Sequence, residues 1–141
     1  FKPFKLKSLD GAARTLADYP GKVTLVSFFF PTCAFCNAEF PHLRTLVERY
    51  KSQGLSVVLI NVVPGENKLI AGWLEKNQYD FPVLTGASQA SLQRDYKLKS
   101  TPTHFLLDAA GNILYTRTGY KSGDDDAMEQ QVQAALGQPA K

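Results

Sequence analysis

The sequence predicts an α/β sandwich, in which helices cover both faces of one mixed central sheet. Runs of apolar and β-branched residues alternate along the chain with segments of helical period, which is typical of parallel strands joined by helices. The alternation closes on two strands around a tight turn, which adds an antiparallel hairpin. A chain of 141 residues can bury a core of its own, so we expect residues 1–141 to form a single domain.

The first predicted elements are an N-terminal β-hairpin and two buried strands. Residues 4–16 alternate apolar and polar side chains around Asp10-Gly11, a dipeptide typical of a hairpin turn. The apolar runs 23–30 and 55–63 are too short and too rich in β-forming residues for helices. We therefore interpret both runs as strands inside the sheet.

A long helix is predicted between these two strands, over residues 33–52. Apolar side chains recur on one of its faces at helical spacing, namely Cys36, Phe40, Leu43, Val47 and Tyr50. Pro41 removes one backbone hydrogen bond and is expected to kink this helix.

The second half of the chain continues the alternation of helices and strands. We expect a helix over residues 66–78, a short strand or extended segment over 81–86 and another helix over 88–97. Residues 103–108 and 112–119 flank a glycine-containing turn and predict the closing hairpin.

The last helix is predicted to begin near Asp124, with Ser122 or Asp124 as its N-cap. Asp125, Asp126 and Glu129 then lie where the helix dipole favours negative charge. We interpret the three consecutive aspartates as a capping cluster and not as a metal site.

Composition and charge argue against several classes of protein. The sixteen lysines and arginines are scattered among thirteen acidic residues and the net charge is only +3, so we expect no binding to nucleic acid.

The longest apolar run, 23–30, is too short to cross a bilayer and starts too late to be a signal peptide. The chain opens at Phe1 and its only methionine is Met128. We expect either a removed signal peptide or anchor, or a shortened chain.

The two cysteines of the chain lie three residues apart in "CAFC". Cys33 is predicted at a strand-to-helix junction, where unpaired N–H groups and the helix dipole stabilise a thiolate. Cys36 lies one turn further on, on the apolar face, and should be buried. An exposed, acidic thiol beside a sheltered one suits thiol–disulfide exchange: Cys33 attacks a substrate disulfide, and Cys36 resolves the mixed disulfide.

A structural disulfide and a zinc site are the alternatives for this pair. A disulfide that closes so small a loop constrains the unfolded chain little. A zinc site needs two further ligands, but the only histidines are His42 and His104, and His42 lies on a different helix face from Cys36. We predict no metal, and no cofactor other than the redox-active disulfide.

A second motif, "STPTHFLLD", places Thr101-Pro102 directly before a predicted strand. Alone, it is explained by a proline that opens a strand, and a cis bond there would be costly. Together with "CAFC" about 65 residues earlier, it resembles the thioredoxin fold. The resemblance covers nearly the whole chain and implies a three-layer thioredoxin-like sandwich. It also implies that a cis-Pro102 packs against the Cys33–Cys36 disulfide and that the backbone at Thr101 pairs with an extended substrate.

The segments "CAFCNAEFPHL" and "TPTHFLLDAAGNIL" are similar to the TlpA/ResA-like thiol–disulfide oxidoreductases, in which Glu39 and Pro41 match a characteristic glutamate and proline. The resemblance implies reduction of particular protein disulfides, for example in cytochrome c maturation. Its implied partners are protein thiols and disulfides and an upstream thiol–disulfide electron donor. It also implies an extracytoplasmic location, often with an N-terminal membrane tether; we expect a monomer.

The sequence departs from the family pattern beside the cysteines. The family usually has tryptophan near the first cysteine, whereas this chain has Pro31-Thr32, and Thr32 can bond to a helix N–H or to a substrate. Ser27 stands where thioredoxin buries an aspartate, and a serine cannot take a proton from Cys36. Glu39 is then the candidate for this task, with a pKa that burial should raise towards neutrality. The alternative for Glu39 is an exposed helix carboxylate.

The interior of the CxxC motif bears on the direction of electron flow. Ala34 and Phe35 carry no charge that would stabilise a thiolate, which favours a reductant over a strong oxidant. Trp73 and His104 are interpreted as packed residues, although His104 shares a strand face with Pro102. The predicted substrate contacts are Thr32, Ala34, Phe35 and Thr101.

A copper carrier and a peroxidase are the other functions considered for this fold. A carrier would hold Cu(I) with the same thiols, but copper chaperones on this fold space their cysteines as CxxxC and add a histidine. A peroxidase needs P-x-x-x-T-x-x-C, and Phe35 and Ala38 occupy the required places. The peroxidase is excluded by its motif. Copper binding, and the oxidation or isomerisation of disulfides, remain the alternatives to disulfide reduction.

Overall fold

One seven-stranded mixed sheet forms the centre of the molecule. The computed structural model describes residues 1–137. Its strands are β1 (Lys5–Ser8), β2 (Ala13–Thr15), β3 (Val23–Phe29), β4 (Leu55–Asn61), β5 (Val83–Thr85), β6 (Thr103–Asp108) and β7 (Ile113–Thr118). Their order across the sheet is β2-β1-β5-β4-β3-β6-β7. β3 pairs in parallel with β4 and antiparallel with β6, so the sheet is mixed as predicted.

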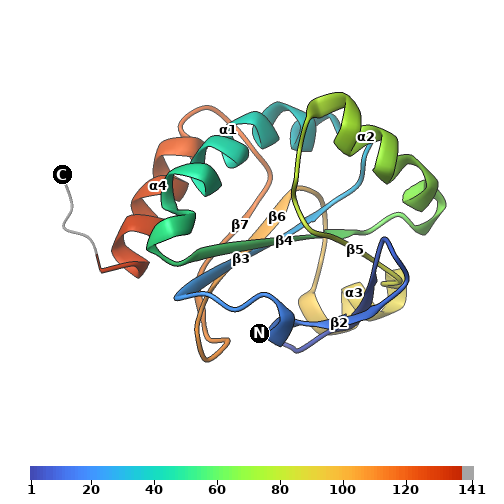
Figure 1. The fold of residues 1–141 in the computed structure, drawn as a ribbon, viewed down its shortest axis with the longest axis horizontal. Coiled ribbons are helices and arrows are strands. Elements are labelled where there is room, and N and C mark those ends of the chain that lie inside the picture. The colour runs from blue at the N-terminus through green and yellow to red at the C-terminus, as the bar shows by residue number, and fades with distance from the viewer. Residues whose placement is uncertain (138–141) are drawn as a thin grey trace.

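Helices cover both faces of this sheet. Within residues 1–137 the α-helices are α1 (Ala34–Tyr50), α2 (Ile70–Asn77), α3 (Gln89–Tyr96) and α4 (Asp124–Ala135). Figure 1 shows α1, α2 and α4 together on one face and α3 on the other, near the N-terminal hairpin. The predicted α/β sandwich of three layers is confirmed.

Both predicted hairpins are present. β1 and β2 pair antiparallel, and the turn between them contains Gly11, whose φ of +85° lies in the left-handed region that favours glycine. β1 also pairs with β5, so this hairpin extends the sheet at one edge. At the opposite edge, β6 and β7 pair antiparallel around the turn that follows Asp108.

β3 is buried along its whole length and separates two apolar cores. Successive side chains of a strand point to opposite faces of the sheet. Leu25 and Phe29 therefore belong to the core beneath α1, α2 and α4, here the α1-side core. Val26 and Phe28 belong to the core on the other face, here the α3-side core. Both cysteines lie in the α1-side core, so this face carries the candidate site.

α1 runs without interruption through Pro41, so this proline does not end the helix. Its buried face carries the residues that the helical period indicated, except that Val47 is only partly buried. The fully or almost fully buried members of that set are Cys36, Phe40, Leu43 and Tyr50.

The helix predicted over residues 66–78 is divided in two. Residues Pro64–Leu69 form a 3-10 helix, and the α-helix begins only at Ile70. The Asn61 side chain at the end of β4 donates a hydrogen bond to Asn67 Oδ1 at 2.7 Å. This bond holds the chain in a tight turn before α2 can start.

The N-cap predicted for the last helix is wrong. Gly123 occupies that position with a φ of +91°, and no side chain caps the helix. The Asp124 carboxylate accepts a hydrogen bond from the Lys121 N–H at 2.8 Å, so it is committed to the preceding turn. Ser122 is exposed.

Candidate active site

The two cysteines form a disulfide at the N-terminus of α1, with their Cα atoms 5.2 Å apart. Cys33 is the N-cap residue, and its Sγ accepts a hydrogen bond from the Cys36 N–H at 3.2 Å. The predicted placement at a strand-to-helix junction is therefore confirmed. Because a helix N-terminus favours negative charge, the sulfur of Cys33 lies where a thiolate is stabilised.

The prediction that Cys33 is exposed is wrong for this disulfide form. Cys33 is only 4% exposed and Cys36 is fully buried. One side of the Cys33 sulfur is bonded to Cys36, and the Thr101 hydroxyl lies 3.3 Å from it.

The Thr101-Pro102 peptide bond is cis, as the resemblance implied. The Thr101 hydroxyl contacts the Cys33 sulfur, so this loop lies against the disulfide. Pro102 is buried, and its carbonyl accepts the Gly119 N–H at 2.8 Å. The backbone of Thr101 makes no hydrogen bond within residues 1–137.

Thr32, directly before Cys33, is tied to a residue that the sequence did not single out. The Thr32 N–H donates to Glu66 Oε1 at 3.0 Å, and its hydroxyl donates to Glu66 Oε2 at 2.7 Å. The hydrogen of the hydroxyl is therefore engaged by Glu66 and not by the start of the helix. These two hydrogen bonds link the 3-10 helix Pro64–Leu69 to the turn that carries the disulfide.

The two residues between the cysteines lie at the surface. Ala34 is exposed, and the Phe35 ring is 63% exposed. An aromatic ring that remains largely in water beside a redox-active disulfide offers apolar area to a partner.

Trp73 packs in the α1-side core, as predicted, but it also supports the active-site turn. Its ring centroid lies 5.0 Å from that of Phe29, and its indole N–H donates to Asn37 Oδ1 at 2.8 Å. The Asn37 amide in turn donates to the carbonyls of Pro31 and Cys33, both at 2.9 Å. The indole thus holds an amide that fixes the backbone on either side of Thr32.

A buried polar chain lies on the face of the sheet that carries the disulfide, next to the α1-side core. Ser27 on β3 and His104 on β6 are directly opposite each other in the sheet, and Ser27 Oγ lies 2.6 Å from His104 Nδ1. His104 Nε2 lies 2.8 Å from Glu39 Oε1. Ser27 and His104 are fully buried and Glu39 is 3% exposed, so Glu39 is not the exposed carboxylate of the alternative. His104 is packed as expected, but its contact with Glu39 was not predicted.

Arg117 on β7 completes this chain. Its Nη2 donates a hydrogen bond to Glu39 Oε2, and its Nε donates to the Gly119 carbonyl at 2.9 Å. The same Nε lies 3.7 Å from an oxygen of the buried Asp124. Arg117 Nη1 is buried and makes no hydrogen bond among the described residues. Glu39 therefore faces an imidazole and a guanidinium together.

The direction predicted for the pKa of Glu39 is wrong. Burial alone raises the pKa of this carboxyl, but the hydrogen bonds and charges of His104 and Arg117 outweigh burial and lower it below its usual value of 4.5. Glu39 is therefore an ionised carboxylate at neutral pH.

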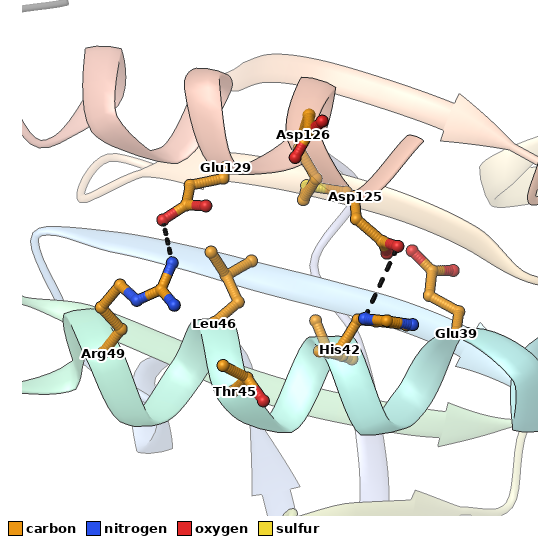
Figure 2. A pocket seen from close by; sticks show the side chains of 10 residues that line it. Glu39, His42, Thr45, Leu46, Arg49, Asp125, Asp126 and Glu129 are labelled. Carbon is orange, nitrogen blue, oxygen red and sulfur yellow. Dashed lines mark hydrogen bonds and ion pairs between the residues drawn. The ribbon is translucent and has the colours of Figure 1, made fainter. Parts of the chain in front are cut away.

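Figure 2 shows a groove between α1 and α4 that reaches Glu39 from the outer side of the helices. Its volume is about 190 Å³. His42 Nδ1 lies 3.7 Å from Asp125 Oδ2, and Arg49 bonds Glu129 further along the groove. The far end of the buried polar chain thus lies next to a surface groove.

The chain is similar to proteins of known family. The profile of the family described as Redoxin matches residues 1–136. The chain belongs to the Redoxin family. Its sequence is 32% identical to the thiol-disulfide oxidoreductase ResA of Geobacillus kaustophilus over 86% of this chain and 69% of that protein. It is 30% identical to ResA of Bacillus subtilis over 82% of this chain and 64% of that protein.

A solved structure supports the same assignment. The thiol:disulfide interchange protein DsbE of Chlorobium tepidum superposes with a TM-score of 0.85 and 30% identity, over 96% of this chain and 94% of that one. This Redoxin-family chain therefore has the thioredoxin-like fold and is a thiol–disulfide oxidoreductase whose CxxC pair is Cys33–Cys36. No helix in the described part of the chain is long and apolar enough to cross a membrane.

Proposed function

We propose that the protein reduces particular protein disulfides, with Cys33 as the attacking and Cys36 as the resolving residue. The observation that carries this assignment of roles is the hydrogen bond from the Cys36 N–H to the Cys33 sulfur at the N-terminus of α1. A thiolate on Cys33 would keep this bond and the favourable helix dipole. Cys36 has no comparable position, because it lies inside the helix and is fully buried.

The exchange proceeds in two balanced steps. The Cys33 thiolate attacks one sulfur of the substrate disulfide, a mixed disulfide forms, and the first substrate thiolate leaves. Cys36 then loses its proton and attacks the Cys33 sulfur, which forms the Cys33–Cys36 disulfide and releases the second substrate thiolate. Two electrons pass from the protein dithiol to the substrate, and an upstream dithiol donor restores the reduced protein.

Substrate docking is proposed along the cis-Pro102 loop and the exposed turn of the CxxC motif. The Thr101 backbone, without hydrogen bonds in residues 1–137, is suited to pair with an extended segment by strand addition. The exposed Phe35 ring and Ala34 would contact apolar parts of the same segment. Thr32, exposed beside Cys33 but bonded to Glu66, would border this surface.

Glu39 is proposed to assist Cys36 when its thiol loses the proton. It lies one helical turn after Cys36, is buried with it and is ionised, so it can favour removal of the thiol proton.

The direction and setting of the reaction are also proposals. Ala34 and Phe35 leave the thiolate without a neighbouring cation in the motif, which supports a reductant. The similarity to TlpA/ResA-like proteins supports an extracytoplasmic setting with a membrane tether. We propose one domain that acts as a monomer. It also supports a substrate such as an apocytochrome disulfide.

The test of direction is the reduction potential of the Cys33–Cys36 couple, measured by equilibration in glutathione or dithiothreitol buffers. A value near or below about −270 mV supports a reductant that awaits a dedicated donor. A value near about −120 mV identifies an oxidant and contradicts the proposed direction.

The assignment of the two cysteines is tested with single variants in an insulin-disulfide reduction assay. We expect Cys33→Ser to abolish turnover and Cys36→Ser to accumulate mixed disulfides that mass spectrometry detects, because only resolution is lost. Activity in both variants would contradict the exchange mechanism.

A further inference from the structure

Of the buried polar chain Ser27, His104 and Glu39, only Glu39 has a role in the proposed exchange reaction. Both nitrogens of the His104 ring have partners, at 2.6 Å on Ser27 and 2.8 Å on Glu39. A ring held at both nitrogens cannot rotate without losing a bond, and each nitrogen has a distinct role. The imidazole is thus fixed in one orientation in the protein interior.

Strand register places this imidazole in the same layer as the disulfide. Ser27 lies between Leu25 and Phe29 on β3, and both neighbours belong to the α1-side core. Leu106, two residues after His104 on β6, belongs to the same core. Since alternate residues of a strand share a face, Ser27 and His104 face the core that contains the cysteines.

The partners of His104 fix the position of its proton. An ionised carboxylate only accepts hydrogen bonds, so the bond to Glu39 requires a hydrogen on Nε2. Nδ1 is then the position that gains or loses a proton. The Ser27 hydroxyl can donate to a bare Nδ1 or accept from a protonated one, so the contact survives either state.

Charged side chains lie next to His104 on the side of Glu39. Arg117 contributes one positive charge, while Glu39 and Asp124 contribute two negative charges, and all three side chains are at most 9% exposed. The exposed Lys121 also bonds Asp124, at the rim of this group. With Lys121 included, the two positive and two negative charges of this group balance.

We propose that His104 is the proton-holding residue of the exchange reaction, which rests on the proposed function. When Cys36 resolves the mixed disulfide, the proton that leaves its thiol is taken up at His104 Nδ1. The Cys36 sulfur bonds to the Cys33 sulfur, the bond from Cys33 to the substrate breaks, and its electron pair leaves with the substrate thiolate. The imidazolium then returns the proton to that thiolate or to solvent. Ser27 and Glu39 act as positioning residues for the ring.

The test separates attack from resolution with equimolar 5,5′-dithiobis(2-nitrobenzoate) and the reduced protein. Attack by Cys33 releases the first chromophore and resolution by Cys36 releases the second. We expect His104→Phe to slow only the second phase, by about a hundredfold, the lower end of what a positioned proton acceptor contributes. A pH above the ordinary thiol value of about 8.5 should restore the rate, which a purely structural defect would not allow.

Two controls accompany this variant. His42→Asn removes the other histidine, whose side chain is 59% exposed on α1, and should leave both phases unchanged. Ser27→Ala keeps the imidazole but removes its Nδ1 partner, so we expect a smaller loss in the second phase. An unchanged second phase in both His104→Phe and Ser27→Ala overturns the inference, whereas a first phase that persists in Cys33→Ser overturns the proposed function itself.

A measurement on the unaltered protein covers the case in which His104→Phe does not fold. The chain has two histidines, so nitrogen chemical shifts of the ring can be assigned with His42→Asn. We expect Nε2 of His104 to carry the hydrogen and Nδ1 to be bare in the reduced protein, which is the tautomer that can accept the Cys36 proton. The opposite tautomer, with the hydrogen on Nδ1 and a bare Nε2, overturns the inference.

Discussion

The two faces of the central sheet bury different kinds of side chain. The α3-side core is apolar, with Val26, Phe28 and Leu92 among its members, and the buried polar side chains on that face, Thr24 and Thr103, are uncharged. The α1-side core contains an equally apolar set, but the disulfide lies within it and the charged chain of Glu39, His104 and Arg117 adjoins it. Among residues 1–137, the buried acids and the buried histidine all lie on this second face.

One small fold thereby combines hydrophobic stability with proton chemistry. Buried charge is costly unless it is paired and hydrogen-bonded. The protein keeps this cost on the face where thiols must lose and regain protons, and within residues 1–137 the other face buries no charged side chain. Substitutions on the two faces should therefore have separable effects on stability and on redox chemistry.

The largest expected effect is the loss of an aromatic ring from the α3-side core. Phe28 is fully buried, with ring centroids 5.1 Å from Tyr96 and 5.9 Å from Phe105. We expect Phe28→Ala to lower the free energy of unfolding by about 3–5 kcal/mol, measured in urea. The reduction potential of the folded variant should match the wild type. A large shift in potential would contradict the separation of the two faces.

The next effect comes from breaking the charged chain on the other face. Arg117→Met removes the cation that bonds Glu39 and leaves the carboxylate with His104 alone. We expect a loss of up to about 3 kcal/mol in the free energy of unfolding, because a buried charge loses a partner. The pKa of Glu39 should rise, since burial is then less opposed, and the pH profile of resolution should move with it. Loss of stability with no change in that profile would make Arg117 a purely structural residue.

A third test uses the pH dependence of stability. The pKa values of Glu39 and Asp124 are lowered in the folded state, by their hydrogen bonds and cationic neighbours acting against burial. Their contribution is therefore complete above their ordinary values of 4.5 and 3.8, and is lost as the pH falls through the lower folded values. Urea midpoints between neutral and acid pH should fall less steeply in Glu39→Gln than in the wild type. Glu48→Gln, exposed on the same helix, is the matched control, and an equal slope in the wild type and Glu39→Gln would contradict the linkage.

The smallest expected effect concerns the bridge between Glu66 and Thr32. Glu66→Ala removes both hydrogen bonds to Thr32, and we expect it to cost about 1 kcal/mol in the free energy of unfolding. Glu75→Ala, an exposed glutamate on α2, serves as the control for a lost side chain. If the two variants lost the same stability, the bridge would contribute nothing.

The strength of local patterns explains what the sequence could predict. The run that became β3, the helical period of α1 and the turn at Gly11 each depend on neighbours in the chain, and each was confirmed. The position of Cys33 at the helix N-terminus follows from the same patterns. The cis bond before Pro102 came only from the family resemblance, because a proline that opens a strand has the same local sequence.

The buried polar chain could not be predicted in the same way. Ser27 and His104 meet only because β3 and β6 pair in one register, and no local pattern specifies that register. The predicted direction for the pKa of Glu39 was wrong because the prediction rested on burial alone. Arg117, which helps to lower this pKa, lies on β7, 78 residues further along the chain. The one available signal was the alternation that placed His104 on the same strand face as Pro102.

The position of Trp73 also makes its intrinsic fluorescence a reporter of the active site. It is the only tryptophan in the chain, and it belongs to the same core as the disulfide. Its indole N–H reaches the carbonyl of Cys33 through a single amide, that of Asn37. A change at the sulfur atoms is therefore transmitted to the indole through two hydrogen bonds. Tryptophan emission can follow each turnover in real time, without a label and without a second indole to obscure the signal.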